Sequence, residues 1–355
     1  MKFAKIRISL LFSLLFLACP LFGQSKTDVV LMKNGDRMTC EIKGLEGGVL
    51  FVSLDYVDGT IQVQWSKVAR LESSRLFIVK TENGSIYKGK ISTAEASGSE
   101  PIKIEVAETP DKKTEIDTAK VVAMDTTSKR LLQRFNGDIN FGMIYSKGNQ
   151  STQYNVSGLV EYPADRWSAH ASFNSTLSSN SGSETSERNQ MDISVRRLLR
   201  KKNYFYSGAG SFLQSSEQGI NLQTSIGGGI GHYFRNTNRA RIAVIGGLAW
   251  QRTNYNDDAG TTLATQNVTA AIIATEIKVF KFKKTNFNIT ANFLPSISEA
   301  GRVYFKLNQS YSVKLFSDLA WNISFYGDWD NRPPGGLPSS DFGTSTGLGW
   351  TFGNK

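Results

Sequence analysis

The side chains that could do chemistry in this sequence stand at alternate positions of short segments and do not gather in one compact motif. His170, Ser172 and Asn174 follow one another two residues apart, and a base, a hydroxyl and an orienting amide are the parts of a nucleophilic hydrolase. In an extended strand these three side chains share one face and form a row. A serine that cleaves membrane lipid must meet its acyl substrate with the base and the orienting group in reach. The row does not favour that geometry, so a lipase-like hydrolase embedded in a membrane is kept as the alternative.

A second set of residues consists of charged side chains and one histidine at the polar positions of alternating segments. Its members are Asp138, Glu161, His170, Asp192, Arg196, Glu276, Lys278, Lys306, Lys314 and Asp328. We predict that they line the inside of a β-barrel, where alternate residues of every strand point inward. Two interpretations stay open: a polar pore of mixed charge that admits small solutes, or ion pairs that fill a narrow lumen. The second is favoured because the side chains of a small barrel nearly fill it.

No residue pattern in the chain predicts a cofactor or a metal ion. Residues 227–231 are rich in glycine, but no Lys-Ser or Lys-Thr pair follows them and no helix is expected to begin there, as a phosphate-binding loop requires. Glycine inside a barrel strand more often marks a bend or a close approach. In residues 28–125, acids, histidines and cysteines do not cluster at the spacing of a metal site. We therefore predict a protein without a cofactor.

The elements that must position these residues are strands with one apolar and one polar face. Between Trp167 and Ser178 the odd positions are mostly apolar and the even positions are polar. The same alternation recurs in residues 135–146 and 287–294. Successive side chains of a strand point to opposite faces, so each segment has an apolar side and a polar side. The pattern indicates β-structure throughout residues 134–352.

Such alternation fits a soluble sandwich or a transmembrane barrel, and segment length and aromatic ends favour the barrel. Many segments run roughly 10 residues, the length of a tilted strand that crosses a bilayer. Their apolar faces begin or end with aromatic residues such as Phe135, Tyr145 and Trp350, as strands do at the two interfaces of a membrane. Single-chain bacterial barrels have an even number of strands, and about twelve segments can be counted. We predict an all-β fold with an antiparallel transmembrane β-barrel of about 12 strands in residues 134–355.

The connections between these segments alternate between short and long. Short ones, such as 200–203 and 283–286, carry Lys or Arg, whereas the longer ones, such as 179–189 and 253–266, are rich in Gly, Ser, Asn and Asp. Barrels of the bacterial outer membrane have short periplasmic turns and longer outer loops. We therefore expect the cell outer membrane as the location, with both ends of the barrel on the periplasmic side.

Residues 1–23 have the pattern of a signal peptide for export. A basic start is followed by a short apolar stretch and by a cleavage site before Gln24. Leu17-Ala18-Cys19 faintly resembles a lipoprotein box, which keeps lipid attachment at Cys19 open. After cleavage Cys40 alone remains, and one cysteine cannot form an internal disulfide.

The chain before the barrel has the pattern of a tandem repeat of two small β modules, 28–74 and 75–125. In each, a β-rich run leads into Asn-Gly, at Asn34-Gly35 and at Asn83-Gly84, and a second β-rich run follows. Asn-Gly between two such runs is the strongest local signal of a β-hairpin. A repeat of roughly 50 residues is enough for four or five strands, so we expect two SH3-like or Sm-like modules in the periplasm. A spacer, a plug and a ligand-binding role stay open for them, and residues 126–133 are expected to be a linker.

Several motifs of the barrel region are similar to those of a known family. The strand Phe135 to Gly142 is followed by Ser146-Lys147-Gly148-Asn149-Gln150, which contains a Ser-x-Gly-Asn turn, and the chain closes on Gly347-Leu348-Gly349-Trp350. Together with Tyr204 to Gly210, these motifs resemble the bacterial family of salt-induced outer-membrane proteins, a domain of unknown function. The resemblance covers residues 134–352 and not the two modules. It implies a barrel and an outer-membrane location, and it supplies no substrate, cofactor or catalytic residue.

These observations lead to one expected function and one alternative. The net charge of +10 does not form a basic stripe with stacking aromatic residues, so no nucleic-acid partner is expected. We expect a non-enzymatic outer-membrane β-barrel that acts as a narrow channel or as a structural protein of the envelope. Its expected partners are outer-membrane lipids and lipopolysaccharide, the barrel-assembly machinery and small solutes. The alternative is the embedded hydrolase that acts on lipids.

Overall fold

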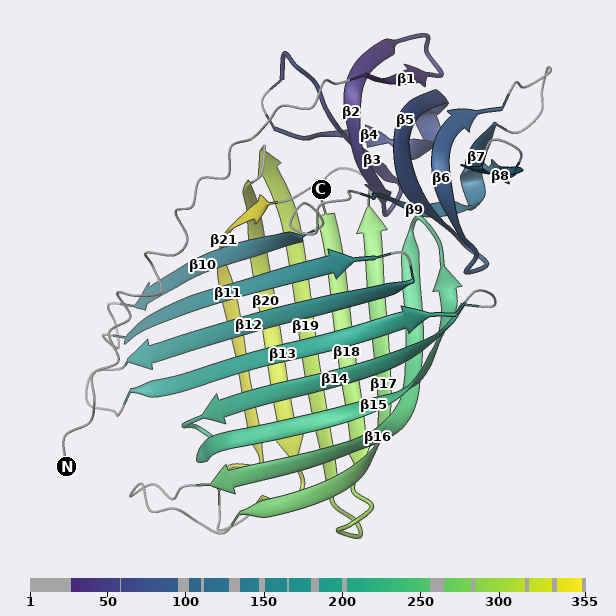
Figure 1. Cartoon of the computed structure of the whole chain (residues 1–355). Helices are drawn as coiled ribbons and strands as arrows, with labels where there is room; N and C mark the ends of the chain where they lie inside the picture. The colour runs from purple at the N-terminus through teal and green to yellow at the C-terminus, as the bar shows by residue number, and fades with distance from the viewer. Residues whose placement is uncertain are drawn as a thin grey trace, which may run out of the picture.

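The computed structural model describes most of the chain between residues 27 and 352. The described part omits residues 58, 95–101, 110–111, 128–134, 147–150, 165, 180–184, 200–202, 256–264, 282–284, 317–318 and 334–336. The predicted signal peptide 1–23, with Cys19, lies outside the described residues, as does most of the predicted linker 126–133. Within the described residues the chain forms an N-terminal β module followed by a closed β-barrel (Figure 1).

The N-terminal module consists of nine strands and two short 3-10 helices. Its elements are β1 (Asp28–Met32), β2 (Arg37–Glu46), β3 (Val49–Ser53), β4 (Ile61–Gln64), η1 (Trp65–Lys67), β5 (Val68–Thr81), β6 (Ile86–Thr93), β7 (Lys103–Thr109), β8 (Lys112–Asp117), η2 (Thr118–Lys120) and β9 (Val121–Thr126). They form one antiparallel sheet in the order β4-β3-β2-β1-β5-β6-β7-β8, and β9 pairs with both β2 and β5. The strands β2, β1, β5 and β9 therefore close into a small ring.

The two halves of the repeat form a single module, which corrects the prediction of separate modules 28–74 and 75–125. The long strand β5 runs through the predicted boundary and pairs with β1 from the first half and with β6 from the second. The last strand of the second half, β9, returns to pair with β2 of the first. Each half alone would leave these strand edges unpaired, and joining the halves satisfies them.

Both predicted Asn-Gly hairpins are confirmed. Gly35 lies between β1 and β2, and Gly84 lies between β5 and β6, and the strands on either side are paired antiparallel. Their φ angles are +94° and +79°, a region of backbone conformation that glycine enters without steric cost. The local sequence therefore determines both turns.

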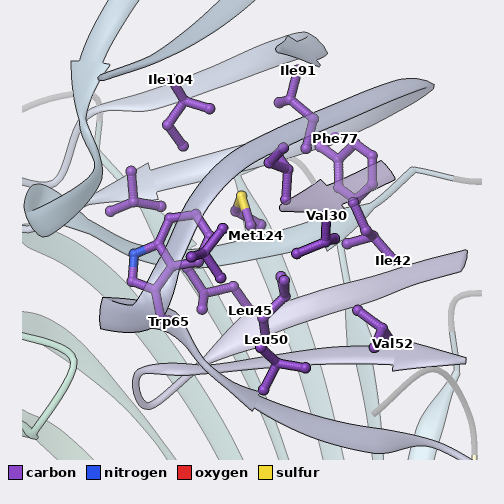
Figure 2. Packing of buried hydrophobic residues seen from close by; sticks show 14 of the residues in the cluster. Val30, Ile42, Leu45, Leu50, Val52, Trp65, Phe77, Ile91, Ile104 and Met124 are labelled. Atoms are coloured by element: carbon purple, nitrogen blue, oxygen red, sulfur yellow. The ribbon is translucent and has the colours of Figure 1, made fainter. Parts of the chain in front are cut away.

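One hydrophobic core holds the module together. Figure 2 shows Val30, Leu45 and Trp65 from the first half packed in one cluster with Phe77 and residues further along the second. The indole Nε1 of Trp65 in η1 donates a hydrogen bond to the carbonyl oxygen of Thr118 in η2, at 2.8 Å. These two 3-10 helices occupy equivalent positions in the repeat, so this bond joins the halves at matching points.

The barrel consists of twelve strands that pair in chain order and close on themselves. They are β10 (Asn136–Ser146), β11 (Ser151–Pro163), β12 (Trp167–Ser179), β13 (Ser186–Leu198), β14 (Tyr204–Ser215), β15 (Ile220–Asn236), β16 (Ala240–Tyr255), β17 (Gln266–Lys281), β18 (Thr285–Pro295), β19 (Val303–Phe316), β20 (Leu319–Asp330) and β21 (Ser340–Phe352). Every neighbouring pair is antiparallel, and β21 closes the barrel against β10. The predicted all-β fold with twelve barrel strands is confirmed.

Alternate residues of each strand face opposite sides of the barrel wall. On the outside, the side chains of Phe141, Ile273 and Trp350 are 62%, 50% and 56% exposed. On the inside, Ala274, the neighbour of Ile273 in β17, is 6% exposed. The outer face is thus apolar and open, and the inner face is more polar and packed.

The module lies at one end of the barrel, which we call the module end (Figure 1). The connections at 199–203 and 237–239 are at this end, next to the module. The opposite end, called the loop end, carries the connections at 216–219 and 296–302. Among the described residues, no helix is long and apolar enough to cross a membrane.

Candidate functional site

The candidate site is the lumen of the barrel, where charged side chains contact each other from strands that are far apart around the wall. Arg196 on β13 places Nη2 2.5 Å from Oε1 of Glu276 on β17. Its Nη1 donates a hydrogen bond to the hydroxyl of Tyr233 on β15, at 2.7 Å. Strands β13 and β17 are separated by three other strands, so this ion pair spans part of the lumen.

Apolar side chains pack beside this ion pair and narrow the lumen near the module end. The guanidinium of Arg196 lies over the ring of Phe205, 4.3 Å from its centroid. Phe205 is fully buried with Ala243, Ile245 and Ala274 in a cluster on the inner face. A charged group at this level is therefore partly shielded from water, with the side chains of Arg196 and Glu276 19% and 22% exposed.

A second ion pair that spans the lumen lies nearer the loop end. We call this pair and the pair of Arg196 with Glu276 the two crossings. Arg188 on β13 forms an ion pair with Asp328 on β20, and its Nε lies 3.8 Å from Asp341 on β21. The guanidinium also lies over the ring of Tyr326, at 4.2 Å. Asp341 accepts a hydrogen bond from Ser215 of β14 at 3.0 Å. These contacts join strands from opposite sides of the barrel.

The loop end is tied together by a third arginine. Arg302, in the connection before β19, is 1% exposed and bonds Asp330 through Nε at 3.1 Å and through Nη2 at 2.6 Å. Burial alone would lower the pKa of Arg302, but hydrogen bonds to Asp330 and Glu299 outweigh burial and hold its pKa above the usual range. Arg302 therefore stays charged. A cavity of about 30 Å³ lies nearby, lined by Tyr304, Lys306 and other residues.

His170 takes part in a short polar chain, but not with the residues expected from its row. Its Nδ1 lies 3.2 Å from Oε1 of Glu161, and its Nε2 lies 3.3 Å from Oγ of Ser168. The hydroxyl within hydrogen-bonding distance of His170 is therefore that of Ser168 and not that of Ser172. The other partner of the imidazole is the carboxylate of Glu161 on β11, and not the amide of Asn174. The charge of Lys278 on β17 acts on Glu161 from across the lumen.

Most of the other predicted lumen residues also have polar partners. Asp138 accepts a hydrogen bond from Asn140 at 2.6 Å, and Asp192 accepts one from Gln190 at 2.8 Å. Lys306 on β19 donates to Gln223 on β15, at 2.8 Å. Lys314 is half-buried and is engaged with the rest of the chain. The predicted set is thus distributed over several levels of the barrel and does not form one cluster.

The sequence pattern did not predict that two residues of the crossing near the loop end face the lumen. Arg188 and Asp341 were assigned to loops, because the expected strands began at 190 and 342. The observed strands β13 and β21 begin at Ser186 and Ser340. Both residues share the parity of the polar positions of their strands, so extending the alternation by a few residues would have found them.

The module covers part of the barrel's mouth through polar side chains of the barrel. Asn203 and Asn238 donate hydrogen bonds to the carbonyl oxygens of Glu82 and Val121, each at 2.7 Å. Arg241 of β16 lies 3.2 Å from Glu46, at the end of β2, and donates to the carbonyl oxygen of Val122 at 3.4 Å.

The turn after Glu46 packs against the barrel wall at the same place. A Cβ atom on Gly47 would lie 2.7 Å from the ring of Phe280, so only glycine fits there. The charge of Glu46 also acts on Glu161, which places this turn close to the chain that includes His170. The module therefore reaches the lumen side of the wall at its own end of the barrel.

Comparison with known proteins assigns the barrel to a family. No curated protein matches the sequence. Similar solved structures include the NanC porin, with 10% identity over 61% of this chain and 99% of that chain and a TM-score of 0.39. They also include the translocator domain of the autotransporter NalP from Neisseria meningitidis, with 12% identity over 61% of this chain and 87% of that chain and a TM-score of 0.35.

A family model matches residues 139–352, which is more than half of the chain and covers the barrel. The matched residues lie within residues 134–352, where the sequence motifs resemble those of a known family. The description of the family names no salt response, so that part of the resemblance stays a prediction. The chain belongs to the family described as "Protein of unknown function, DUF481".

Proposed function

We propose that the protein is a non-enzymatic β-barrel of the outer membrane that acts as a narrow channel. The first support is the outer face of the barrel, where large apolar side chains such as Phe141, Leu248 and Ile273 are 62%, 59% and 50% exposed. Soluble monomers rarely expose a contiguous apolar surface of this kind, whereas a membrane barrel presents it to lipid. Outer-membrane lipids and lipopolysaccharide are then the surroundings of the wall, and the barrel-assembly machinery is the expected route of insertion.

Aromatic residues near both ends of the wall support the same location. At the module end Tyr162 stacks on Trp167 with ring centroids 5.3 Å apart, and Tyr204 lies 4.5 Å from His232. At the loop end the side chain of Trp329 is exposed on the outer face. Amphipathic rings favour the headgroup level of a bilayer, so two such groups mark its two interfaces.

The lengths of the connections support an orientation with the module in the periplasm. The connections at the module end, such as 199–203 and 237–239, are short, and the two at the loop end around residues 256–265 and 331–339 are longer. Outer-membrane barrels place short turns on the periplasmic side. The module then covers the periplasmic mouth of the channel.

The observation that carries the proposal is the pair of ionic crossings in series along the lumen. The pair Arg196–Glu276 constricts the module end, and Arg188–Asp328 constricts the loop end. Charged side chains of both signs at a constriction select small solutes by charge and size. A wide aqueous passage would not bring side chains of such distant strands into contact.

Conductance across planar bilayers tests this function on the full chain. We expect small, discrete openings for the wild type and larger ones for Arg196→Ala and for Arg188→Ala, because each change removes one side of a crossing. Arg197→Ala is the matched control, since Arg197 is the next residue of β13 and points outward. No openings in any variant would reject the channel and favour a structural role in the envelope.

A hydrolase remains the second candidate because Ser168, His170 and Glu161 form a chain with a hydroxyl, an imidazole and a carboxylate in the order that a nucleophilic site needs. Two features speak against it. Ser168 points into the lumen, away from the acyl chains, and the strand backbone around it is engaged in its ladders, so that its N–H groups do not form an oxyanion hole. Lipid hydrolysis that is lost in His170→Ala would reverse this choice.

A further inference from the structure

The closing seam of the barrel, between β10 and β21, differs from every other pair of neighbouring barrel strands in the part of the chain that the structure describes. It has only five residue pairs, from Gly137 opposite Phe352 to Phe141 opposite Leu348. The other neighbouring strands share between nine and fifteen pairs. The ladder therefore stops near the middle of β10, and the rest of β10 and of β21 pair only on their other sides.

Glycines let the two strands stay close where the ladder stops. A Cβ atom on Gly142 would lie 2.4 Å from the carbonyl oxygen of Thr346, and one on Gly347 would lie 2.5 Å from that of Phe141. The seam is closed at this point by backbone approach and not by hydrogen bonds of a ladder. In hydrocarbon an unpaired strand edge is costly, unless it borders a polar cavity.

An apolar groove of about 680 Å³ lies on the outer face over this seam. Its walls are formed by outward-facing side chains of β10, β20 and β21, and glycine residues form its floor. The lining includes Phe141, Met143, Trp321, Leu348 and Trp350, with Gly347 and Gly349 between them. The groove begins at the module end of β10 and β21 and extends to the place where the pairing stops.

A polar cluster lies on the inner face directly behind the same glycines. Asn322 of β20 donates a hydrogen bond to Asn140 of β10, across the inner face of β21. A Cβ atom on Gly349 would lie 1.7 Å from Oδ1 of Asn140, so glycine is what lets this bond pass. Asn140 in turn donates to the carboxylate of Asp138 at 2.6 Å. The wall is therefore thin here, apolar outside and polar and acidic inside.

We propose that the seam between β10 and β21 is a lateral portal that binds one phospholipid with an ammonium headgroup. This inference rests on the proposed membrane location. The acyl chain lies in the groove against Phe141, Met143 and Leu348. The headgroup enters between the strands where the pairing stops, next to Asn140, whose side-chain carbonyl oxygen accepts a hydrogen bond from the ammonium. Asp138 supplies the opposite charge.

Two features favour such a phospholipid over other membrane lipids. The groove occupies the module half of the wall, which is the half that faces the inner leaflet in the proposed orientation. Asp138 lies close enough to Glu161 for the two negative charges to interact. A phosphate-rich or otherwise anionic headgroup would be repelled by this pair, whereas an ammonium is attracted.

Native mass spectrometry of the full chain tests the portal. The protein is reconstituted into vesicles with equal amounts of phosphatidylethanolamine and phosphatidylglycerol and then extracted into detergent. We expect one phosphatidylethanolamine to stay bound to the wild type. Thr346→Trp fills the groove and should lower the bound fraction at least fivefold. Thr344→Trp is the matched control, because Thr344 is exposed on the same face of β21 but does not line the groove.

A second variant tests the opening of the seam. In the double variant Met143→Cys with Thr346→Cys, the two cysteines stand where the next outward-facing residue pair of the seam would be if its register continued. Oxidation to a disulfide then locks the seam shut. The locked protein should carry no phosphatidylethanolamine until it is reduced. The control Phe173→Cys with Met191→Cys locks a fully paired position between β12 and β13 and should bind lipid as the wild type does.

Three results would overturn the inference: a wild type without bound phospholipid, equal retention by Thr346→Trp and the wild type, or retention of phosphatidylglycerol as readily as phosphatidylethanolamine. Failure of the membrane location looks different, because the protein would then not enter the vesicles at all. A protein that enters the vesicles but holds no phospholipid overturns the portal alone.

Discussion

Arg196 of β13 and Glu276 of β17 face each other inside the barrel, with Nη2 2.5 Å from Oε1. Each charge compensates the other at the narrow level beside Phe205. In the proposed channel this pair decides which ions pass, because a single uncompensated charge at a constriction attracts ions of the opposite sign.

Neutralising either partner of this pair should therefore shift ion selectivity in opposite directions. Glu276→Gln leaves the charge of Arg196 and favours anions, and Arg196→Gln leaves the charge of Glu276 and favours cations. The reversal potential in a salt gradient measures the preference. Arg197→Gln, on the outer face, should leave the potential unchanged. Identical potentials in all three variants would contradict the role of the pair.

A charge placed on the two faces of the wall should have very different costs. Ile273→Arg places an unpaired charge on the outer face near the middle of β17, and we expect a loss of about 2–4 kcal/mol of folding free energy. Thr290→Arg is the comparison, because Thr290 is paired with Glu276 and shares its inward face. Its loss should be far smaller. Folding titrations in lipid vesicles measure both, and equal losses would mean that the outer face does not meet hydrocarbon.

The buried ion pair of the module should be important for its stability. Arg75 contacts Asp28, whose side chain is 1% exposed and also accepts a hydrogen bond from the backbone of Ile42 at 2.8 Å. Arg75→Ala leaves the buried carboxylate uncompensated and should cost about 3–5 kcal/mol. Arg70→Ala is the control, because the pair of Arg70 with Glu72 is exposed and should contribute at most about 1 kcal/mol. Urea titration of the module gives both values.

Cys40 gives the module a pH dependence at the alkaline end. Burial, followed by the charge of Asp28, raises the pKa of the Cys40 thiol from 9.0 to about 12. Between these values the unfolded chain loses the thiol proton and the folded chain keeps it, so stability falls as pH rises above 9. The expected slope is about 1.4 kcal/mol per pH unit.

The difference between the wild type and Cys40→Ala isolates this contribution from that of lysine and tyrosine. Unfolding free energies measured from pH 8 to pH 11 should converge as pH rises, because the wild type loses the advantage. Parallel curves would show that the thiol titrates normally in the folded module.

The module should fold without the barrel. All buried residues of its core belong to residues 30–124, and each of its strands finds its pairing partners within the module's own sheet. Residues 28–125 expressed alone should show protected amides in hydrogen exchange, and the barrel from residue 134 should fold in detergent without them. If protection appeared only with the barrel present, the module would be a plug that folds on docking.

The faces of the barrel strands could be predicted because alternation is a local property. The parity of residues 167–178 already separates Trp167 and Phe173 from His170, and the structure keeps that separation. The Asn-Gly turns were predictable for the same reason, since Gly35 needs only its immediate neighbours to adopt a positive φ.

Contacts between distant segments were not accessible from the same patterns. The pairing of β9 with β2 depends on how the two halves of the module curl together, and no local signal separates one module from two. The partner of Arg196 is set by the closure of the barrel, which decides that β17 lies within reach of β13. Strand ends were also uncertain by a few residues, and that alone hid Arg188.

The contacts between barrel and module are asymmetric in their chemistry. The barrel contributes the side chains of Asn203, Asn238 and Arg241, and the module mainly contributes backbone carbonyls. A carbonyl is the same for every residue type, so a position such as Glu82, which offers only its backbone oxygen to the barrel, could change its side chain without losing the contact. The barrel asparagines have no such freedom. A library of random substitutions selected for docking should therefore tolerate many residues at Glu82 but few at Asn203.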